Sequence, residues 1–321
     1  MSSPSSSAKG DFIGMGVLVV GLIAADLLLG SHFYRGLALQ IMIFSIASVG
    51  LTLLVGFTGQ ISIGQNAFVA IGAYMLANAV QALHLHPVIG VILGTLLSAL
   101  LGFLIARPIL RLQGHYLGLA TLAIGAAAQI IASQWREVTG GLDPGIVDLP
   151  ALTIGSTNVL FWFVGLCLVI VVGLALCVVH SPVGRALQTI RTSETLAAGN
   201  GIPVAATKAA VFAFSAGTAG LAGGLYALFM RSFNAGSFGV MMSIELLMMV
   251  MVGSLSTIWG GLFGAALVIL LPQALEHFEN AKLFIYGTIM TLVVMFMPSG
   301  LASSAFHLIQ RLFGRKEEVS R

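Results

Sequence analysis

The polar side chains best placed for chemistry in this chain stand inside long apolar stretches. The segment Leu54–Met75, LVGFTGQISIGQNAFVAIGAYM, sets hydroxyl and amide side chains among four glycines. Amides and hydroxyls donate and accept hydrogen bonds without carrying charge, so they suit the binding of polar groups rather than the cleavage of bonds. The candidate residues of this segment are Gln60, Ser62, Gln65 and Asn66.

This segment has two interpretations if the apolar stretches span a membrane. Non-helical backbone in a bilayer is tolerated only where protein buries it or where it lines a cavity, and transporters build pathways from broken helices with polar residues. The first interpretation is therefore a translocation pathway lined by the four residues. The second is a polar, Gly-rich turn at the cytoplasmic interface, followed by an ordinary helix.

A carboxylate, Glu245, is the other candidate, and it stands in the apolar run MMSIELLMMVMVG. An ionised side chain at mid-membrane costs on the order of 3 kcal/mol or more, so Glu245 needs a partner or a wet cavity. One interpretation is a structural hydrogen bond to a neighbouring helix. The other makes Glu245 a pathway or gating residue, and we count it among the pathway candidates.

Motifs for catalysis and for metal or nucleotide binding are missing from the sequence. It contains no G-x-x-x-x-G-K-[ST], H-E-x-x-H, G-x-S-x-G or C-x-x-C, which are the patterns for phosphate cradles, zinc sites, serine nucleophiles and redox pairs. His84 and His86 have no third ligand nearby. We expect no catalytic residue, no metal and no cofactor bound by this chain. Any uphill process must draw on an ion gradient or on a partner ATPase.

The composition indicates the elements that position these residues. Of the 321 residues, 58% are hydrophobic and 8% are charged, against about 25% charged in soluble domains. Such a chain cannot cover a soluble globule, and the composition excludes a soluble enzyme, a disordered chain and a nucleic-acid binder with a basic face. It predicts an all-α, polytopic transmembrane helical bundle.

About ten apolar segments approach the roughly 20 residues that a spanning helix needs. They cover residues 12–30, 36–55, 61–80, 87–106, 115–134, 159–179, 208–230, 240–258, 259–276 and 283–299. Gly-rich turns near 56–60 and 258–260 make two boundaries uncertain, so eight or nine spans are the alternative. The domain prediction is a polar tail over 1–11, a transmembrane domain over 12–300 and a C-terminal tail over 301–321.

Basic residues predict the orientation, because Lys and Arg collect in cytoplasmic loops. Ten of the 14 fall on the side of the 180–207 connection and four on the other, so both termini are expected in the cytoplasm. The 135–158 loop, with more acidic than basic residues, is expected outside. Within 180–207, a short amphipathic helix over 184–198 is expected on the cytoplasmic surface, and Gly199, Gly201 and Pro203 end it.

Five ordered motifs resemble a known family. They are GFTGQISIGQNAFVAIGAY, RPILRLQGHYLGLATLAIG, TGGLDPGI, the run VGRALQTIRTSETLAAGNGIPVAATKAAVFAFSAGTAGLAGGLYA, and SIELLMMVMVGSLSTIWGGLFGAAL. In this order and spacing they resemble LivM-type permeases of bacterial branched-chain amino acid ABC importers. The resemblance covers nearly the whole chain.

The resemblance implies partners for the chain. These are a LivH-type second permease, two ATP-binding cassette subunits that use ATP and Mg, and a periplasmic substrate-binding protein. It also implies a multi-pass location in the bacterial inner membrane, in contact with lipid and with no nucleic acid. The 184–198 helix would be the coupling helix to the ATPases, where Arg185 and Arg191 pair with ATPase carboxylates or anchor the membrane surface. The coupling candidates are Arg185, Arg191, Glu194, Ala197, Ala198 and Gly199.

The function implied is a transport subunit, not an enzyme, that passes branched-chain amino acids delivered by the binding protein. Urea, short amides or aromatic acids are the alternative substrates within the same importer class. A stand-alone secondary carrier, motivated by Glu245 and by the polar Leu54–Met75 segment, is the alternative from another class.

Overall fold

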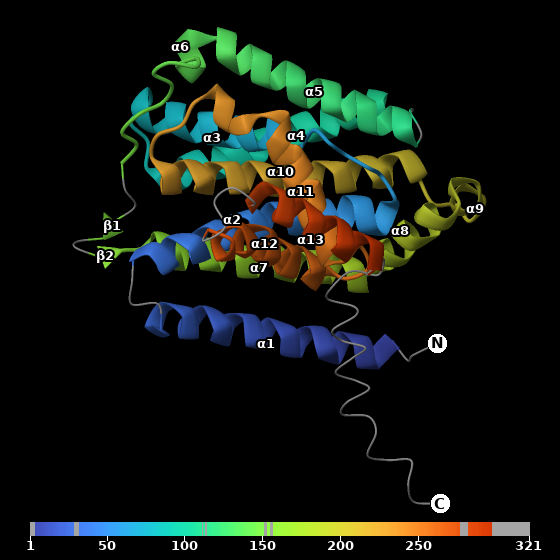
Figure 1. Ribbon diagram of the computed structural model, residues 1–321. Helices are drawn as coiled ribbons and strands as arrows, with labels where there is room; N and C mark the ends of the chain where they lie inside the picture. Colours follow the sequence, from blue (N-terminus) through green and yellow to red (C-terminus); the bar gives the residue numbers. More distant parts are fainter. Residues whose placement is uncertain are drawn as a thin grey trace, which may run out of the picture.

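The computed structural model describes residues 4–28, 32–110, 112, 114–150, 153–154, 157–276 and 282–296. In these ranges the chain is almost wholly helical, and most of the long helices lie side by side along one axis (Figure 1). The α-helices are α1 (Pro4–Leu28), α2 (His32–Thr52), α3 (Gln65–Gln81), α4 (Pro87–Ile109), α5 (His115–Gln134), α6 (Arg136–Thr139), α7 (Leu160–His180), α8 (Pro182–Thr192), α9 (Glu194–Gly199), α10 (Val204–Met230), α11 (Val240–Gly253), α12 (Ile258–Ala274) and α13 (Lys282–Phe296).

The other elements are short. A π-helical turn, η1 (Leu53–Phe57), follows α2, and a 3₁₀ turn, η2 (Ala235–Phe238), precedes α11. The two-residue strands β1 (Thr153–Ile154) and β2 (Thr157–Asn158) form one antiparallel pair. The expected all-α class is therefore confirmed, and each of the ten apolar segments contains a helix.

The expected count of about ten spans is not confirmed. Five helices of the described residues are long and apolar enough to cross a membrane: 32–57, 87–109, 115–134, 160–180 and 204–230. The helices α11 and α12 pass this test only as a pair, and they are bent by 119° at the break between them. The pair is a broken span or a re-entrant hairpin, which gives six candidates at most.

The centre of the bundle is formed by α2 and α10. In their most apolar stretches, 83% and 78% of the residues are buried, whereas α4 and α5 bury only 28%. The helix α10 packs against α4, α3 and α2, while α12 and α7 pack on α2. The outermost layers are α5 on one side and α1 on the other (Figure 1).

Glycines let the central helices approach backbone to backbone. A Cβ atom built on Gly72 of α3 would lie 1.9 Å from the carbonyl oxygen of Gly220 on α10, and one on Gly223 would lie 1.9 Å from the carbonyl oxygen of Val69. The hairpin of α11 and α12 closes in the same way, because a Cβ on Gly264 would lie 1.7 Å from the Met249 carbonyl oxygen. No side chain fits at these contacts, so the glycines are packing residues.

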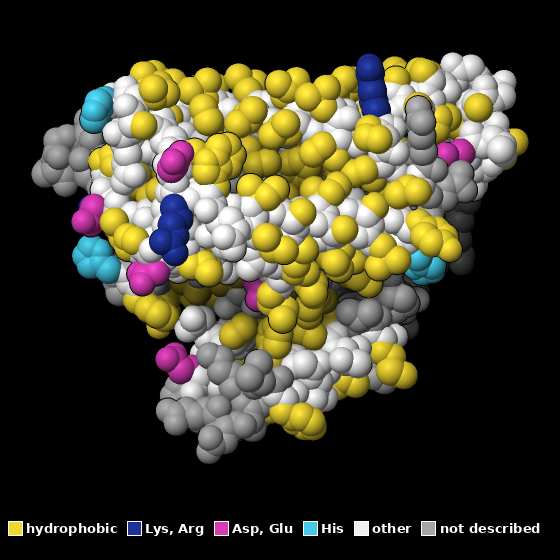
Figure 2. Space-filling view, turned by 90° about the horizontal axis from the view of Figure 1, so that it is seen from above, with side chains coloured by type: hydrophobic (Ala, Val, Ile, Leu, Met, Phe, Trp, Pro, Cys, Tyr) yellow, Lys and Arg dark blue, Asp and Glu magenta, His cyan; other side chains and the backbone are white. Residues whose placement is uncertain are grey.

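The two ends of the bundle differ from its middle. The short helices α8 and α9 lie at one end, with the start of α1, and α6 and the β1–β2 pair lie at the other (Figure 1). Figure 2 shows one face with an apolar belt between two ends where ionisable side chains gather. The 135–158 and 180–207 connections thus lie at opposite ends, as the sequence predicts.

Two helical regions have bounds that differ from the expected ones. The first helix begins at Pro4, so most of the expected 1–11 tail is helical. The expected amphipathic helix over 184–198 is two helices, because Ser193 is extended and its hydroxyl accepts the Leu196 N–H at 3.3 Å as the cap of α9. Serine is a preferred cap because its side chain satisfies a free N–H. The predicted tail over 301–321 lies outside the described residues.

A polar contact holds the start of α1 to the bundle. The Asp11 carboxylate lies 2.7 Å from Nε2 of His180, at the end of α7. It also accepts a 2.9 Å hydrogen bond from the Trp259 indole, at the start of α12. Outside this contact α1 packs mainly against α7.

Candidate functional site

The Leu54–Met75 segment is a broken helix buried in the bundle. After η1 the helical backbone ends at Thr58, and residues 59–64 are non-helical before α3 begins at Gln65. Gly59 has a φ of +73°, a conformation that glycine adopts readily. A Cβ on Gly56 would lie 2.1 Å from the Leu255 carbonyl oxygen, and one on Gly64 would lie 2.2 Å from the Thr121 carbonyl oxygen. Neighbouring backbone therefore packs closely against both ends of the break, while Gly59 and Ile61 within it are exposed.

All four polar candidates of this segment are buried: Gln60, Ser62, Gln65 and Asn66 are each at most 3% exposed. Gly59 and Ile61, in the same break, are exposed, so the polar side chains point into the bundle while part of the turn lies at its surface. Non-helical backbone buried by protein is the arrangement that a bilayer tolerates. The hydrogen bonds of the four side chains then distinguish their roles.

Every polar atom of the Asn66 side chain forms a hydrogen bond to a neighbouring element. Its amide nitrogen donates to the carbonyl oxygens of Gly125 on α5 and Phe238 in η2, at 3.1 and 3.0 Å. Its side-chain oxygen accepts from the Ser243 hydroxyl at 2.7 Å, and its backbone N–H donates to the same hydroxyl at 2.8 Å. Asn66 therefore joins α3 to α5, η2 and α11.

Gln60, Ser62 and Gln65 retain unused polar atoms. Nε2 of Gln65 donates to the Ser215 hydroxyl on α10 at 3.0 Å, but its Oε1 has no partner among the described residues. Within the same part of the chain, both polar atoms of the Gln60 amide and the Ser62 hydroxyl are also buried without a partner. Each such group costs about 1–3 kcal/mol unless water or a ligand satisfies it. These three residues offer donors and acceptors to a polar solute.

The partners from other helices were not singled out by the sequence. They are small hydroxyl residues: Ser215, Ser243 and Thr121, whose Oγ1 accepts the Ile63 N–H at 3.0 Å. All three are at most 1% exposed. The sequence feature that could have predicted them is a lone Ser or Thr within a strongly apolar helix, because its hydroxyl needs a hydrogen-bond partner there.

Glu245 does not join this cluster. It lies two residues after Ser243 on α11, which places the two side chains on roughly opposite faces of the helix. Glu245 is exposed, and no described residue forms a hydrogen bond or ion pair with it. The expected structural hydrogen bond from a neighbouring helix is not found among the described residues.

The coupling candidates on α8 and α9 divide into outward and inward groups. Arg185, Arg191, Glu194, Ala198 and Gly199 are all exposed, but two of these side chains reach inward to other elements. Arg191 donates a hydrogen bond to the Gly56 carbonyl oxygen in η1, and Glu194 pairs with Lys208 of α10. The remaining candidate, Ala197, is fully buried. The inward group therefore ties α8 and α9 to η1 and α10.

No group of three or more metal-ligating side chains occurs among the described residues. The two cysteines, Cys167 and Cys177, are both free thiols.

Comparison with known proteins assigns the family. A family model described as "Branched-chain amino acid transport system / permease component" matches residues 33–297. This chain belongs to that permease family. The matched region of the permease starts at the beginning of α2 and extends through α13.

Curated relatives of this permease carry corresponding names. The high-affinity branched-chain amino acid transport system permease protein LivM of Salmonella typhimurium is 28% identical over 293 residues, covering 83% of this permease and 69% of the relative. LivM of Escherichia coli is also 28% identical, covering 81% and 68%. A probable branched-chain amino acid transport permease protein LivH of Methanocaldococcus jannaschii is 24% identical, covering 83% and 90%. No solved structure matches the permease.

Proposed function

We propose that this chain is a transport subunit that passes branched-chain amino acids through the bacterial inner membrane as part of an ATP-driven importer. The family match over residues 33–297 carries the proposal. The names of the LivM relatives support the choice of substrate. In this role the chain itself is not an enzyme.

The pathway residues are Gln60, Ser62 and Gln65. Their unpaired amide and hydroxyl groups, buried in a broken helix, suit a solute that needs both donors and acceptors during its passage. Asn66 supports this segment through its bonds to three neighbouring elements. Glu245 stands on another face of α11, where a second permease or a wet pathway would cover an exposed carboxylate at membrane depth.

The coupling surface is the exposed side of α8 and α9. Arg185, Ala198 and Gly199 lie on it, together with Leu196, whose side chain is 62% exposed. Two ATPase subunits would dock here, bind ATP and Mg, and move the helices. Arg191 and Glu194 would pass that movement on, because they bind η1 and α10.

The membrane orientation follows from this surface. We place α8, α9 and the start of α1 in the cytoplasm, and the 135–158 loop outside, where a periplasmic binding protein would dock. Ten of the 14 basic residues lie on the cytoplasmic side of this arrangement, which also puts the 301–321 tail there. With α1 and the shorter helices α3 and α13 the crossings number eight, and α11 and α12 enter and leave the membrane on one side as a re-entrant pair, which keeps both termini in the cytoplasm.

The first test is a pull-down of the tagged chain from mild detergent. We expect two ATPases and a LivH-type permease in stoichiometric amounts. Reconstitution of this assembly with its binding protein should then give ATP-dependent leucine uptake. A well-folded chain that purifies alone, or an assembly that takes up no branched-chain amino acid, would contradict the proposal.

One observation favours a second candidate function. Glu245 is an exposed carboxylate within an apolar helix, as in ion-coupled carriers. A stand-alone secondary carrier predicts uptake by this chain alone in proteoliposomes under an ion gradient. Urea, short amides and aromatic acids are the competing substrates in the uptake assay of the full assembly.

A further inference from the structure

A cavity of about 480 Å³ opens where three elements meet at the α8 end of the bundle. Gly56 and Phe57 of η1 form one wall, and Leu255 and Ser256, in the break between α11 and α12, form another. The last turn of α8 closes it with Gln188, Arg191 and Thr192. Both broken helices therefore border this space, and its volume lies within the roughly 300–1,000 Å³ of small-molecule sites.

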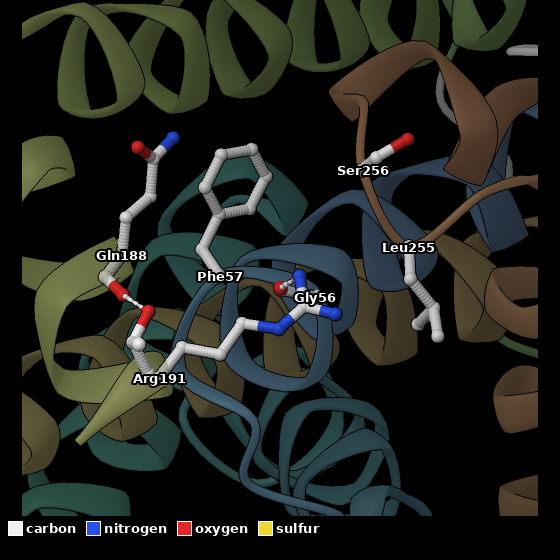
Figure 3. A pocket seen from close by; sticks show the side chains of 7 residues that line it. Gly56, Phe57, Gln188, Arg191, Leu255 and Ser256 are labelled. Carbon is white, nitrogen blue, oxygen red and sulfur yellow. Dashed lines mark hydrogen bonds between the residues drawn. The ribbon is translucent and has the colours of Figure 1, made fainter. Parts of the chain in front are cut away.

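Arg191 crosses this space toward η1 (Figure 3). One terminal nitrogen donates to the Gly56 carbonyl oxygen, and its Cγ lies 3.5 Å from the position of a Cβ on Gly59. A guanidinium has five N–H donors in a planar fork, which matches a carboxylate in bidentate geometry. The bond to Gly56 uses one of them, and no ion pair between described residues involves Arg191. The cavity lining contains no acidic side chain.

The rest of the lining has both polar and apolar groups. Phe57 and Leu255 offer apolar surface, while Gln188 and Ser256 are polar residues that line the same space (Figure 3). A positive charge without a counter-ion, beside an apolar wall, suits a small molecule with one carboxylate and a short aliphatic body.

The position of the cavity relates it to the broken segment. Gly56 and Phe57 come directly before the break, and Gln60 follows three residues after Phe57. A solute leaving the unpaired amide of Gln60 toward α8 would meet the Arg191 side chain there.

We propose that this cavity is a binding site for the carboxylate of an aliphatic amino acid, held by Arg191 at the α8 end of the pathway. The identity of the ligand rests on the proposed function, whereas the carboxylate chemistry rests on the cavity itself. The site would take an amino acid that is leaving the pathway or one already accumulated on that side. The ligand is the same amino acid in both cases, and it should bind the purified chain without ATP.

The test is ligand-dependent thermal unfolding of the detergent-purified chain, with no ATPase present. Leucine should raise the Tm in a dose-dependent way by about 2–4 °C, because it binds only the folded state. Leucinamide, which lacks the carboxylate, should not. Arg191→Gln should weaken the leucine effect by about 10- to 100-fold, the factor expected for a charge-assisted hydrogen bond. Arg107→Gln, which removes the same charge outside the cavity lining, should respond as the unmodified chain does.

Ser256→Phe is a second variant that tests the site if Arg191→Gln fails to fold. It fills the cavity and leaves the Arg191 side chain in place, and it should also abolish the leucine effect. The site is refuted if leucine has no effect on the unmodified chain, if it stabilises Arg191→Gln equally, or if leucinamide, acetate or phosphate acts as well as leucine. Uptake by an assembly whose purified permease does not bind leucine would refute this site alone. Leucine binding by a chain that recruits no ATPase would refute the proposed importer instead.

Discussion

At the scale of single residues, hydrogen bonds distinguish the roles of side chains that look alike in the sequence. Gln60, Gln65 and Asn66 are all amides of one segment, yet Asn66 has every side-chain polar atom bonded and Gln60 has none. The sequence could predict that these amides matter, because polar groups within apolar helices need partners. It could not predict which one is structural, because the partners of Asn66 lie about 60 to 177 residues away.

A pair of matched substitutions tests this division. Asn66→Leu removes three side-chain hydrogen bonds and leaves buried partners unpaired, at about 1–3 kcal/mol for each orphaned group. We expect a Tm in detergent that is lower by several degrees. Gln60→Leu removes an amide with no partner in the described protein, so it should keep the Tm and reduce leucine uptake. Equal loss of Tm in the two variants would show that Gln60 is also structural.

Glycine gives a second prediction at a single position. Gly72→Ala places a methyl group 1.9 Å from the Gly220 carbonyl oxygen, so α3 and α10 must separate. We expect a cost of about 1–3 kcal/mol or more and a lower yield of folded protein. Gly118→Ala is the control, because its methyl group would meet nothing closer than the Ile61 side chain at 3.8 Å. Similar chemical-denaturation midpoints for both variants would argue against the close contact of α3 with α10.

At the scale of elements, the apolar pattern predicted where helices occur but not where they bend. The break before α3 lies among Gly59, Gln60 and Gly64, which the composition made visible. The second break lies at 254–257, just ahead of the 258–260 turn that the glycines suggested. Both glycines at 260 and 261 instead pack inside α12 against Ser254 and Ser48. The sequence does not show whether a glycine permits a close helix contact or a turn, because the two roles depend on tertiary packing.

The ion pair between α9 and α10 yields an element-scale prediction. The side chain of Lys208 is only 7% exposed, whereas that of Glu194 is 43% exposed. Glu194→Lys leaves a buried ammonium beside a like charge, which is unfavourable. We expect a lower Tm and weaker recovery of ATPases in the pull-down, and the combined change with Lys208→Glu should restore part of both. The control is Glu137→Lys at the other end of the bundle. Failure of the double variant to recover either property would mean that the pair does not hold α9.

At the scale of the whole molecule, the arrangement of charge predicts a topology. Ionisable side chains gather at the two ends of the face in Figure 2, with an apolar belt between them. The composition alone indicates a membrane protein, because 8% charged residues can cover only the two ends of the bundle with water-exposed charge. The number of crossings could not be read from hydropathy, because α3, α11 and α12 are 17, 14 and 17 residues long and their placement depends on neighbours.

Cysteine labelling in intact cells tests the topology. In a background with Cys167→Ala and Cys177→Ala, single cysteines replace Glu137 and Ala206, which are exposed at opposite ends. A membrane-impermeant maleimide should label Glu137→Cys from outside, and should label Ala206→Cys only after the cells are broken. The reverse pattern would invert the orientation, and labelling of both in intact cells would contradict a bundle that spans the membrane.

The hairpin of α11 and α12 has a consequence for how the chain is made. All five long spans lie before residue 231, so the machinery that recognises hydrophobic segments during synthesis meets them first. The halves of the hairpin, of 14 and 17 residues, are each too short to be inserted on length alone. They come after α2, the helix against which α12 packs most closely, is already in place. A chain truncated after residue 230 should therefore insert its five long spans and leave uncovered the side of α2 against which α12 packs. We expect α11 and α12, which follow residue 230, to enter the bilayer by docking on the earlier part of the same protein.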